Sequence, residues 1–119
     1  MIVKMNNKNE KFYQYMGKIF ESRIIQNQTN DRIYDDDNKT WYLNIEDEKV
    51  LAFVSIANNT IKNVYTTKDK SIEELLKTVR EENKIGSSTV TNRYEDSYKK
   101  TGYKIERTDG LKNFIVISA

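Results

Sequence analysis

Residues 40–66 read TWYLNIEDEKVLAFVSIANNTIKNVYT, and this stretch decides the fold. β-branched and aromatic residues fill three segments of it, separated by the polar turns EDEK (46–49) and Asn58-Asn59. Such residues favour strands, and breaks of this length join antiparallel neighbours. The third segment alternates between two sets of residues: Ile61, Asn63 and Tyr65 on one side, and Lys62, Val64 and Thr66 on the other. The sequence therefore predicts a three-stranded antiparallel meander.

An amphipathic helix is predicted on each side of the meander. Between residues 9 and 26, apolar residues recur at steps of three and four, the spacing of one helix face: Phe12, Tyr15, Met16, Ile19, Phe20 and Ile24. A short strand from Met1 to Met5 precedes this helix. The second helix covers about 72–84, and Ser71 and Glu74 have the spacing of a capping box at its start. Its apolar face consists of Ile72, Leu75, Leu76 and Val79.

The remaining chain predicts a strand, a short helix and a closing pair of strands. These are STVT (88–91), RYEDSYKKTG (93–102) with Gly102 as its C-terminal cap, and YKIER (103–107) and NFIVIS (113–118) around an Asp109-Gly110 turn. The resulting order is β-α-β-β-β-α-β-α-β-β. We expect one α+β domain of residues 1–119, with a mixed, mostly antiparallel twisted sheet and three helices.

Composition excludes several classes of function. The chain has 119 residues, 37% hydrophobic and 11% aromatic, which is typical of a globular domain. It contains no Cys and no His, which excludes a disulfide framework, a thiolate zinc site, a cysteine nucleophile and the usual base of a serine triad. Lys+Arg (20) and Asp+Glu (18) nearly cancel, so we do not expect a nucleic-acid partner, although the formal charge is +2.

Two polar segments bear on location and on metals. The N-terminus MIVKMNNKNEK lacks the apolar core of a secretory signal, and the chain has no apolar run of ~18 residues, so we expect a cytoplasmic protein with no membrane partner. Residues 26–39 lack a sustained period and include Asp35, Asp36 and Asp37, which repel one another. Consecutive aspartates do not have the spaced ligands and central Gly of an EF-hand, so a mobile, solvated loop is the favoured interpretation.

The segment TNRYEDSYKKTGYKI (91–105) resembles a segment of the GNAT superfamily of acyl-CoA N-acyltransferases, roughly N-x-x-A-x-x-(apolar)-Y-x-x-x-G-(F/Y). Tyr98, Gly102 and Tyr103 stand at the matching spacing, and the element order is that of the GNAT fold. The strands around Ala52-Phe53 are also similar to the family's second and third strands, which carry Gly-Phe there. The resemblance implies transfer of an acetyl group from acetyl-CoA to an amine of a small molecule or protein. It also implies that Tyr98 is the general acid for the leaving thiolate.

The sequence departs from the family in the loop that holds the CoA pyrophosphate. Relatives carry (Q/R)-x-x-G-x-(G/A) there, because glycines let backbone N–H groups converge on an anion at a helix N-terminus. This chain reads VYTTKDKSIEELL (64–76) and has no Gly between Gly17 and Gly86. The resemblance implies the following cofactor-binding residues: Tyr65, Thr66, Thr67, Lys68, Lys70, Ser71 and Asn92. We expect weak acetyl-CoA binding that depends on Lys68 and Lys70. The alternative is that these two lysines are only solvated surface charges.

Further departures leave two hypotheses open. Thr91 stands where the family has Asn, with Asn92 one residue later, and bulky Tyr94 replaces a small residue that faces the cofactor. Segment 60–66 has no Asp or Glu, so no general base is identified. The first hypothesis is an N-acetyltransferase-like protein, with Tyr98 either its acid or only a core aromatic. The alternative is a catalytically inactive GNAT-fold binding or regulatory module, which acts through contacts with a protein partner or in a homodimer.

Overall fold

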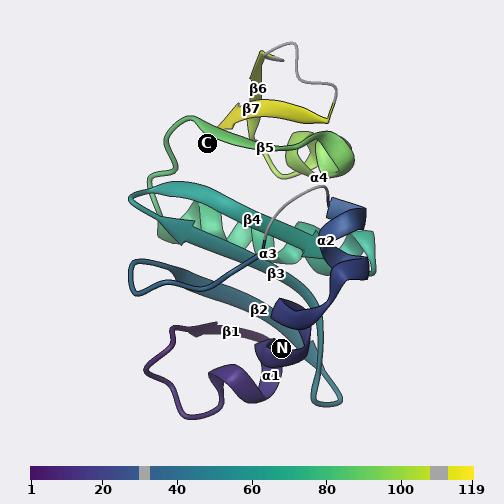
Figure 1. The fold of residues 1–119 in the computed structure, drawn as a ribbon. Helices are drawn as coiled ribbons and strands as arrows, with labels where there is room; N and C mark the ends of the chain where they lie inside the picture. Colours follow the sequence, from purple (N-terminus) through teal and green to yellow (C-terminus); the bar gives the residue numbers. More distant parts are fainter. Residues whose placement is uncertain (30–32, 108–112) are drawn as a thin grey trace.

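The computed structural model describes residues 1–29, 33–107 and 113–119, so the predicted Asp109-Gly110 turn lies outside the described residues. The strands form two sheets, one with the order β1-β2-β3-β4 and one with the order β5-β7-β6 (Figure 1). The strands are β1 (Ile2–Met5), β2 (Thr40–Glu46), β3 (Lys49–Ala57), β4 (Thr60–Thr66), β5 (Ser88–Thr91), β6 (Lys104–Arg107) and β7 (Phe114–Ser118). The helices are α1 (Phe12–Glu21), α2 (Arg23–Thr29), α3 (Asp69–Glu82) and α4 (Glu95–Lys100), with a 3-10 turn η1 (Asn92–Tyr94) before α4.

The predicted meander is confirmed, and two-residue turns join its strands. Asp47-Glu48 and Asn58-Asn59 all have positive φ angles, between 50° and 66°. Consecutive positive φ values belong to the turns whose twist matches that of antiparallel neighbours. Asp and Asn tolerate this conformation better than most residues. Local turn chemistry therefore sets the pairing of β2 with β3 and of β3 with β4.

A β-bulge in β4 changes which of its side chains share a face. Asn63 pairs with Ser55 and Ile61 with Ile56, so Lys62 is an extra residue in the strand. Ile61 and Val64 consequently lie in one core cluster, whereas Tyr65 packs in the other. The predicted grouping of Ile61 with Asn63 and Tyr65 is therefore wrong, because the bulge reverses the alternation at Lys62.

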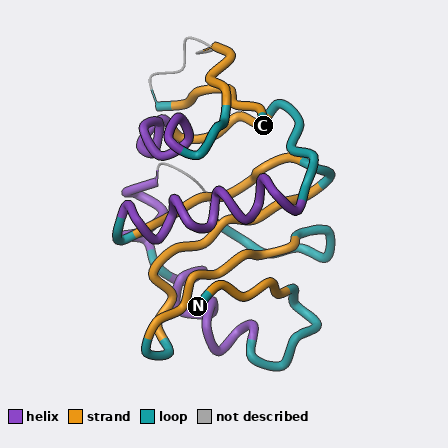
Figure 2. The backbone as a smooth tube through the Cα atoms, turned by 180° about the vertical axis from the view of Figure 1, so that it is seen from behind, coloured by secondary structure: helices purple, strands orange, loops and turns teal. Residues whose placement is uncertain are grey.

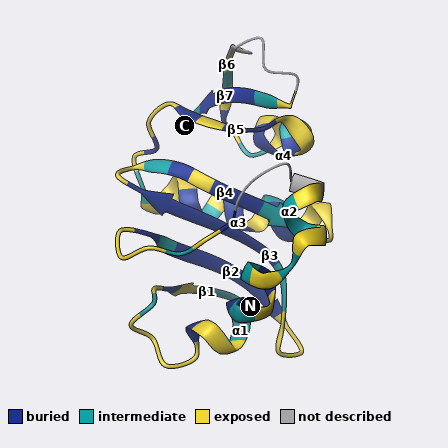
Figure 3. Cartoon of the chain, viewed as in Figure 1, coloured by how far each residue is buried: buried dark blue, intermediate teal, exposed yellow. Residues whose placement is uncertain are grey.

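Helices cover both faces of the larger sheet. Figure 2 shows α3 lying across the back of this sheet, and α1 and α2 lie on the opposite face (Figure 1). Trp41 to Ile45 of β2 and Ala52 to Ala57 of β3 are buried without alternation (Figure 3). Strands that are buried on both faces read as continuous apolar runs. The meander is therefore the centre of the molecule.

The first predicted helix, over residues 9–26, is two helices in the structure. The chain becomes extended at Ser22 (φ −81°, ψ 109°), between α1 and α2. The Ser22 hydroxyl accepts a hydrogen bond from the Ile25 backbone N–H at 3.2 Å, which caps the new helix. The described chain thus has four α-helices rather than three, and residues 26–29 belong to α2 rather than to a loop.

The described part of the polar stretch, residues 33–39, is not solvated along its whole length. Hydrogen bonds hold two of its aspartates to other parts of the chain. Asp35 accepts hydrogen bonds from Trp41 Nε1 at 2.9 Å and from the Tyr13 hydroxyl at 3.2 Å. Asp37 accepts one from Asn7 Nδ2 at 2.8 Å. The neighbouring carboxylates thus have separate partners, and in the described chain no group of three acidic side chains is placed to hold a metal ion. Of the helices described, none has the length and apolar character that a membrane crossing requires.

The apolar face predicted for the second helix is confirmed, since Leu76 on α3 is fully buried. We expect Leu76→Ala to lower the free energy of unfolding by about 2–5 kcal/mol, because it leaves a cavity between α3 and the sheet. Urea unfolding measures this loss. Lys77→Ala, on the exposed side of the same turn, is the control and should change stability by less than about 0.5 kcal/mol. A loss in Leu76→Ala as small as in the control would contradict this packing.

Candidate functional site

The space between β4 and β5, which we call the seam, lies where the two sheets meet. At one end the Gly86 N–H donates to the Asn59 carbonyl at 2.8 Å, and the Ile61 N–H donates to the Ser88 hydroxyl at 2.9 Å. At the other end the Thr66 N–H donates to the Tyr94 hydroxyl at 3.3 Å. The two strands run in the same direction but form no ladder, and these bonds hold them side by side.

Backbone donors of β4 point into the seam. The Thr67 N–H donates to the Leu51 carbonyl of β3 at 2.9 Å. Bonding directions alternate along an antiparallel pair, so the N–H groups of Val64 and Thr66 point away from β3, toward β5. The register of β3 on β4 therefore places the N–H and C=O groups of Val64 and Thr66 on this edge, and Tyr94 accepts the hydrogen bond from the N–H of Thr66.

Little free space remains between these donors and β5. The cavity in the seam has a volume of about 30 Å³. Its lining residues are Lys62, Val64, Thr89, Val90, Thr91 and Phe114. A single water in the liquid has a share of about 30 Å³, whereas small-molecule sites usually measure about 300–1,000 Å³. The chain of an organic ligand therefore does not fit in this cavity.

Tyr94 closes the seam beside Thr66. It ends η1, a turn in which the Thr91 hydroxyl accepts from the Arg93 N–H at 3.4 Å. Its side chain is 6% exposed and belongs to the core cluster that α3 covers. Burial raises the pKa of the Tyr94 phenol by more than the hydrogen bond from Thr66 lowers it. The phenol is therefore neutral at pH 7 and accepts the Thr66 N–H with an uncharged oxygen.

Tyr98, the candidate general acid, lies on α4 in the core. Its side chain is 0% exposed, and its ring packs edge-on against Tyr103 with centroids 5.8 Å apart. The Tyr103 N–H donates to the Tyr98 carbonyl at 3.0 Å, and Gly102 has a φ of 92°. This is the glycine-ended helix terminus that the sequence predicts. The catalytic role of Tyr98 stays a prediction, and it requires movement that exposes the hydroxyl.

The capping box predicted at Ser71 and Glu74 is wrong. α3 begins at Asp69, so Ser71 is the third residue of the helix, and the N-cap is Lys68, whose side chain makes no capping bond. Asn44 of β2 engages both predicted partners, donating from Nδ2 to the Ser71 carbonyl at 3.2 Å and to Glu74 Oε2 at 3.2 Å. A contact between β2 and α3 therefore takes the place of the local one, and the helix starts earlier than expected.

The loop between β4 and α3 uses two of its backbone donors, those of Lys68 and Ser71, in bonds of its own. The Lys68 N–H donates to the Thr66 hydroxyl at 3.0 Å, and the Ser71 N–H donates to the Lys68 carbonyl at 3.1 Å. Asp69 adds a carboxylate in the first helical turn, where it stabilises the helix dipole but repels an anion. An anion at this end of α3 would therefore meet the exposed ammonium groups of Lys68 and Lys70 rather than a backbone cradle.

Comparison with known proteins rests on structure. No family model matches the sequence. No curated protein matches it either. An acyl-CoA N-acyltransferase from Pseudomonas aeruginosa matches over 98% of this chain and 97% of its own, with 10% identity and a TM-score of 0.65. The N-acetyltransferase PseH from Campylobacter jejuni, in complex with acetyl coenzyme A, matches over 100% of this chain and 98% of its own, with 16% identity and a TM-score of 0.54.

The chain has the acyl-CoA N-acyltransferase fold. A second structure of PseH agrees, with 15% identity, a TM-score of 0.56 and coverage of 99% of this chain and 96% of that one. The fold class expected from the sequence is thereby confirmed. At identities of 10–16%, these matches establish only the arrangement of the backbone. The chemistry depends on the residues of this chain.

The acyl-CoA N-acyltransferase fold places the predicted cofactor residues unequally. Those from Thr66 to Ser71 surround the start of α3, although Ser71 is buried. Tyr65 points to the other face of the sheet, where its ring lies 5.6 Å from that of Phe53. Asn92 is exposed where β5 ends, and its backbone N–H donates to the Asn113 carbonyl at 2.9 Å. The sequence alone does not single out the Val64 amide among the strand N–H groups, because the direction of this amide depends on strand register and not on its side chain.

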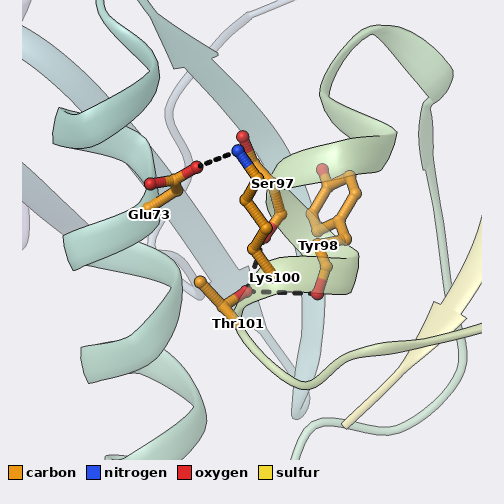
Figure 4. A network of polar contacts seen from close by, with 5 residues as sticks. All are labelled: Glu73, Ser97, Tyr98, Lys100 and Thr101. Atoms are coloured by element: carbon orange, nitrogen blue, oxygen red, sulfur yellow. Dashed lines mark hydrogen bonds and ion pairs between the residues drawn. The ribbon is translucent and has the colours of Figure 1, made fainter.

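A groove between α3 and α4 runs beside Lys70. Its volume is about 300 Å³, and it is lined by Lys70, Glu73, Glu74, Lys77, Lys100 and Thr101. Figure 4 shows Glu73 of α3 and Lys100 of α4 pointing toward each other. Their charged atoms are 3.6 Å apart. Both side chains are partly in solvent, so this ion pair stabilises little. The groove has room for a small ligand and offers charges of both signs.

The uncapped start of α3 predicts a stabilising substitution. Lys68→Ser should raise the free energy of unfolding by about 0.5–1 kcal/mol, because a hydroxyl at this extended N-cap accepts a free N–H of the first turn. Chemical denaturation measures the gain. Lys70→Ser removes the same charge without creating a cap, and it should gain less. Equal effects of the two substitutions would show that charge, not capping, limits this helix end.

Proposed function

We propose that the chain is an N-acetyltransferase-like protein that transfers an acetyl group from acetyl-CoA to an amine. The observation that supports this best is the match over nearly the full length of both chains to acyltransferases, one of them in complex with acetyl coenzyme A. The Tyr98, Gly102 and Tyr103 segment supports it further, since it ends α4 beside the core of this fold. The acceptor is an amine on a small molecule or on a protein.

In this proposal the amine nitrogen attacks the thioester carbon of acetyl-CoA. A C–N bond forms, the C–S bond breaks and CoA leaves as a thiolate. The backbone N–H of Val64, which faces the seam, stabilises the negative charge that develops on the thioester oxygen. Tyr98 protonates the thiolate once its hydroxyl is exposed, and the amine loses its proton to solvent because β4 contains no carboxylate.

Acetyl-CoA binding is weak in this proposal for two reasons. The seam is closed, so the apparent affinity is reduced by the fraction of molecules in which it is open. The start of α3 offers the phosphates the charges of Lys68 and Lys70 in place of converging backbone donors. Exposed ammonium groups act as point charges, and salt screens them.

An inactive GNAT-fold module is the second candidate. The seam volume of about 30 Å³ and the lack of Asp or Glu in β4 favour it, because they remove space for the donor and an obvious base. Such a module would act through contacts with a protein partner or with a second copy of the chain. Catalytic turnover separates the two candidates, since an inactive module produces no acetylated amine.

The enzymatic proposal predicts slow acetylation that depends on Tyr98. Mass spectrometry should detect acetylated product when the protein is incubated with acetyl-CoA and a lysine peptide, a peptide with a free N-terminus or a polyamine. Tyr98→Phe keeps the buried ring and should reduce turnover by about 10²–10⁴-fold, the usual contribution of general acid catalysis. Tyr15→Phe, a change on α1, is the control. Turnover that is absent from the parent protein for all three amines would favour the inactive module.

The role of the two lysines is tested through ligand-induced stabilisation. Excess CoA should raise the melting temperature of the parent protein slightly. Lys68→Ala/Lys70→Ala should abolish this shift, and added salt should imitate the loss. Lys8→Ala/Lys11→Ala removes two exposed lysines near α1 and should retain the shift. A full shift in the Lys68/Lys70 variant would show that CoA does not use the start of α3.

A further inference from the structure

We propose that Tyr94 is a built-in plug of the seam, which fills space there and occupies the backbone donor of Thr66, and thereby sets the affinity of the protein for acetyl-CoA. This inference rests on the proposed function, because it assigns the seam to acetyl-CoA. It goes further in naming one side chain of this protein as the competitor of its own ligand.

Tyr94 competes with any ligand in the seam for the backbone N–H of Thr66. A backbone N–H has one hydrogen to donate, and that of Thr66 is directed to the Tyr94 hydroxyl at 3.3 Å. Thr66 is partly buried, so leaving its N–H without a hydrogen-bond partner destabilises the protein. A ligand that bonds to this donor must therefore displace the Tyr94 phenol. A ligand that leaves the phenol in place cannot use this donor.

The seam also has little space for a ligand. Val64 and Thr91, which flank the seam on its two strands, line a cavity of only about 30 Å³. The Tyr94 ring lies in the same cluster as Val64 and Val90 and is almost fully buried. Interiors pack too densely for a ligand chain to enter beside such a ring. Tyr94 is not one of the residues that line this cavity, but its hydroxyl contacts Thr66 at one end of the seam. We expect removal of the ring to open the seam at that end.

The Tyr94 side chain can be changed without disturbing the start of α4. Tyr94 precedes the first residue of α4, but its side chain makes no capping bond to that helix. Its backbone (φ −110°, ψ 27°) is open to any L-residue, so substitution imposes no backbone strain. The side chain can therefore be shortened without removing a helix cap.

Isothermal titration with acetyl-CoA tests the plug. We expect Tyr94→Ala and Tyr94→Leu to bind acetyl-CoA at least about tenfold more tightly than the parent, because an open seam rises from a minor to the major population. Tyr94→Leu keeps apolar packing and serves if Tyr94→Ala does not fold. Tyr42→Ala is the matched control, since it removes another buried tyrosine of the same cluster, whose hydroxyl instead contacts Glu82 on α3. Circular dichroism confirms folding.

The outcomes separate this inference from the proposed function. Tighter binding in a Tyr94 variant but not in Tyr42→Ala supports the plug, even if the parent protein shows no turnover. A folded Tyr94→Ala or Tyr94→Leu that binds acetyl-CoA no more tightly than the parent overturns it. The acetyltransferase proposal stands in that case if the parent still acetylates an amine, and it fails if neither binding nor turnover is found.

Discussion

The outer edge of β4 is the constraint on which the rest of the structure depends. β3 pairs with one edge of this strand, and the N–H groups on its other edge must find partners as the core packs around them. Ser88 supplies one partner near the start of the strand, and Tyr94 supplies one at its end. Two sheets that do not form a ladder are joined in this way. Between the same bonds, a cavity of about 30 Å³ separates the two strands.

Most of the fold follows from local patterns in the sequence. The meander is specified by β-branched residues and by the Asp47-Glu48 and Asn58-Asn59 turns. The conformation of each turn depends only on the few residues that form it. The buried face of α3 follows from its apolar period. The break of the first helix at Ser22 is a local capping effect that the apolar period does not reveal. Two other features that were predicted wrongly depend on a distant contact and on a single extra residue. Asn44 of β2 contacts both residues of the supposed capping box on α3, and Lys62 reverses the alternation of β4.

The candidate site was predictable in part. Spacing identified Tyr94 and Tyr98 as the residues whose positions matter, because resemblance carries over positions along the chain. Whether a side chain at such a position faces a cavity or fills one depends on packing between β4, β5 and α3, which no short motif encodes. The burial of Tyr98 and the use of the Thr66 N–H by Tyr94 therefore emerged only from the structure.

Amide hydrogen exchange at Thr66, followed by NMR in the parent and in Tyr94→Phe, tests the closed seam most directly. The account predicts that the Thr66 amide is protected in the parent protein and that its protection falls in Tyr94→Phe, which keeps the ring but lacks the acceptor. The Thr67 amide, bonded to Leu51, should stay unchanged in the same sample and serves as the internal reference. A Thr66 amide that exchanges as fast as exposed amides in the parent, or that is equally protected in both proteins, would contradict the account.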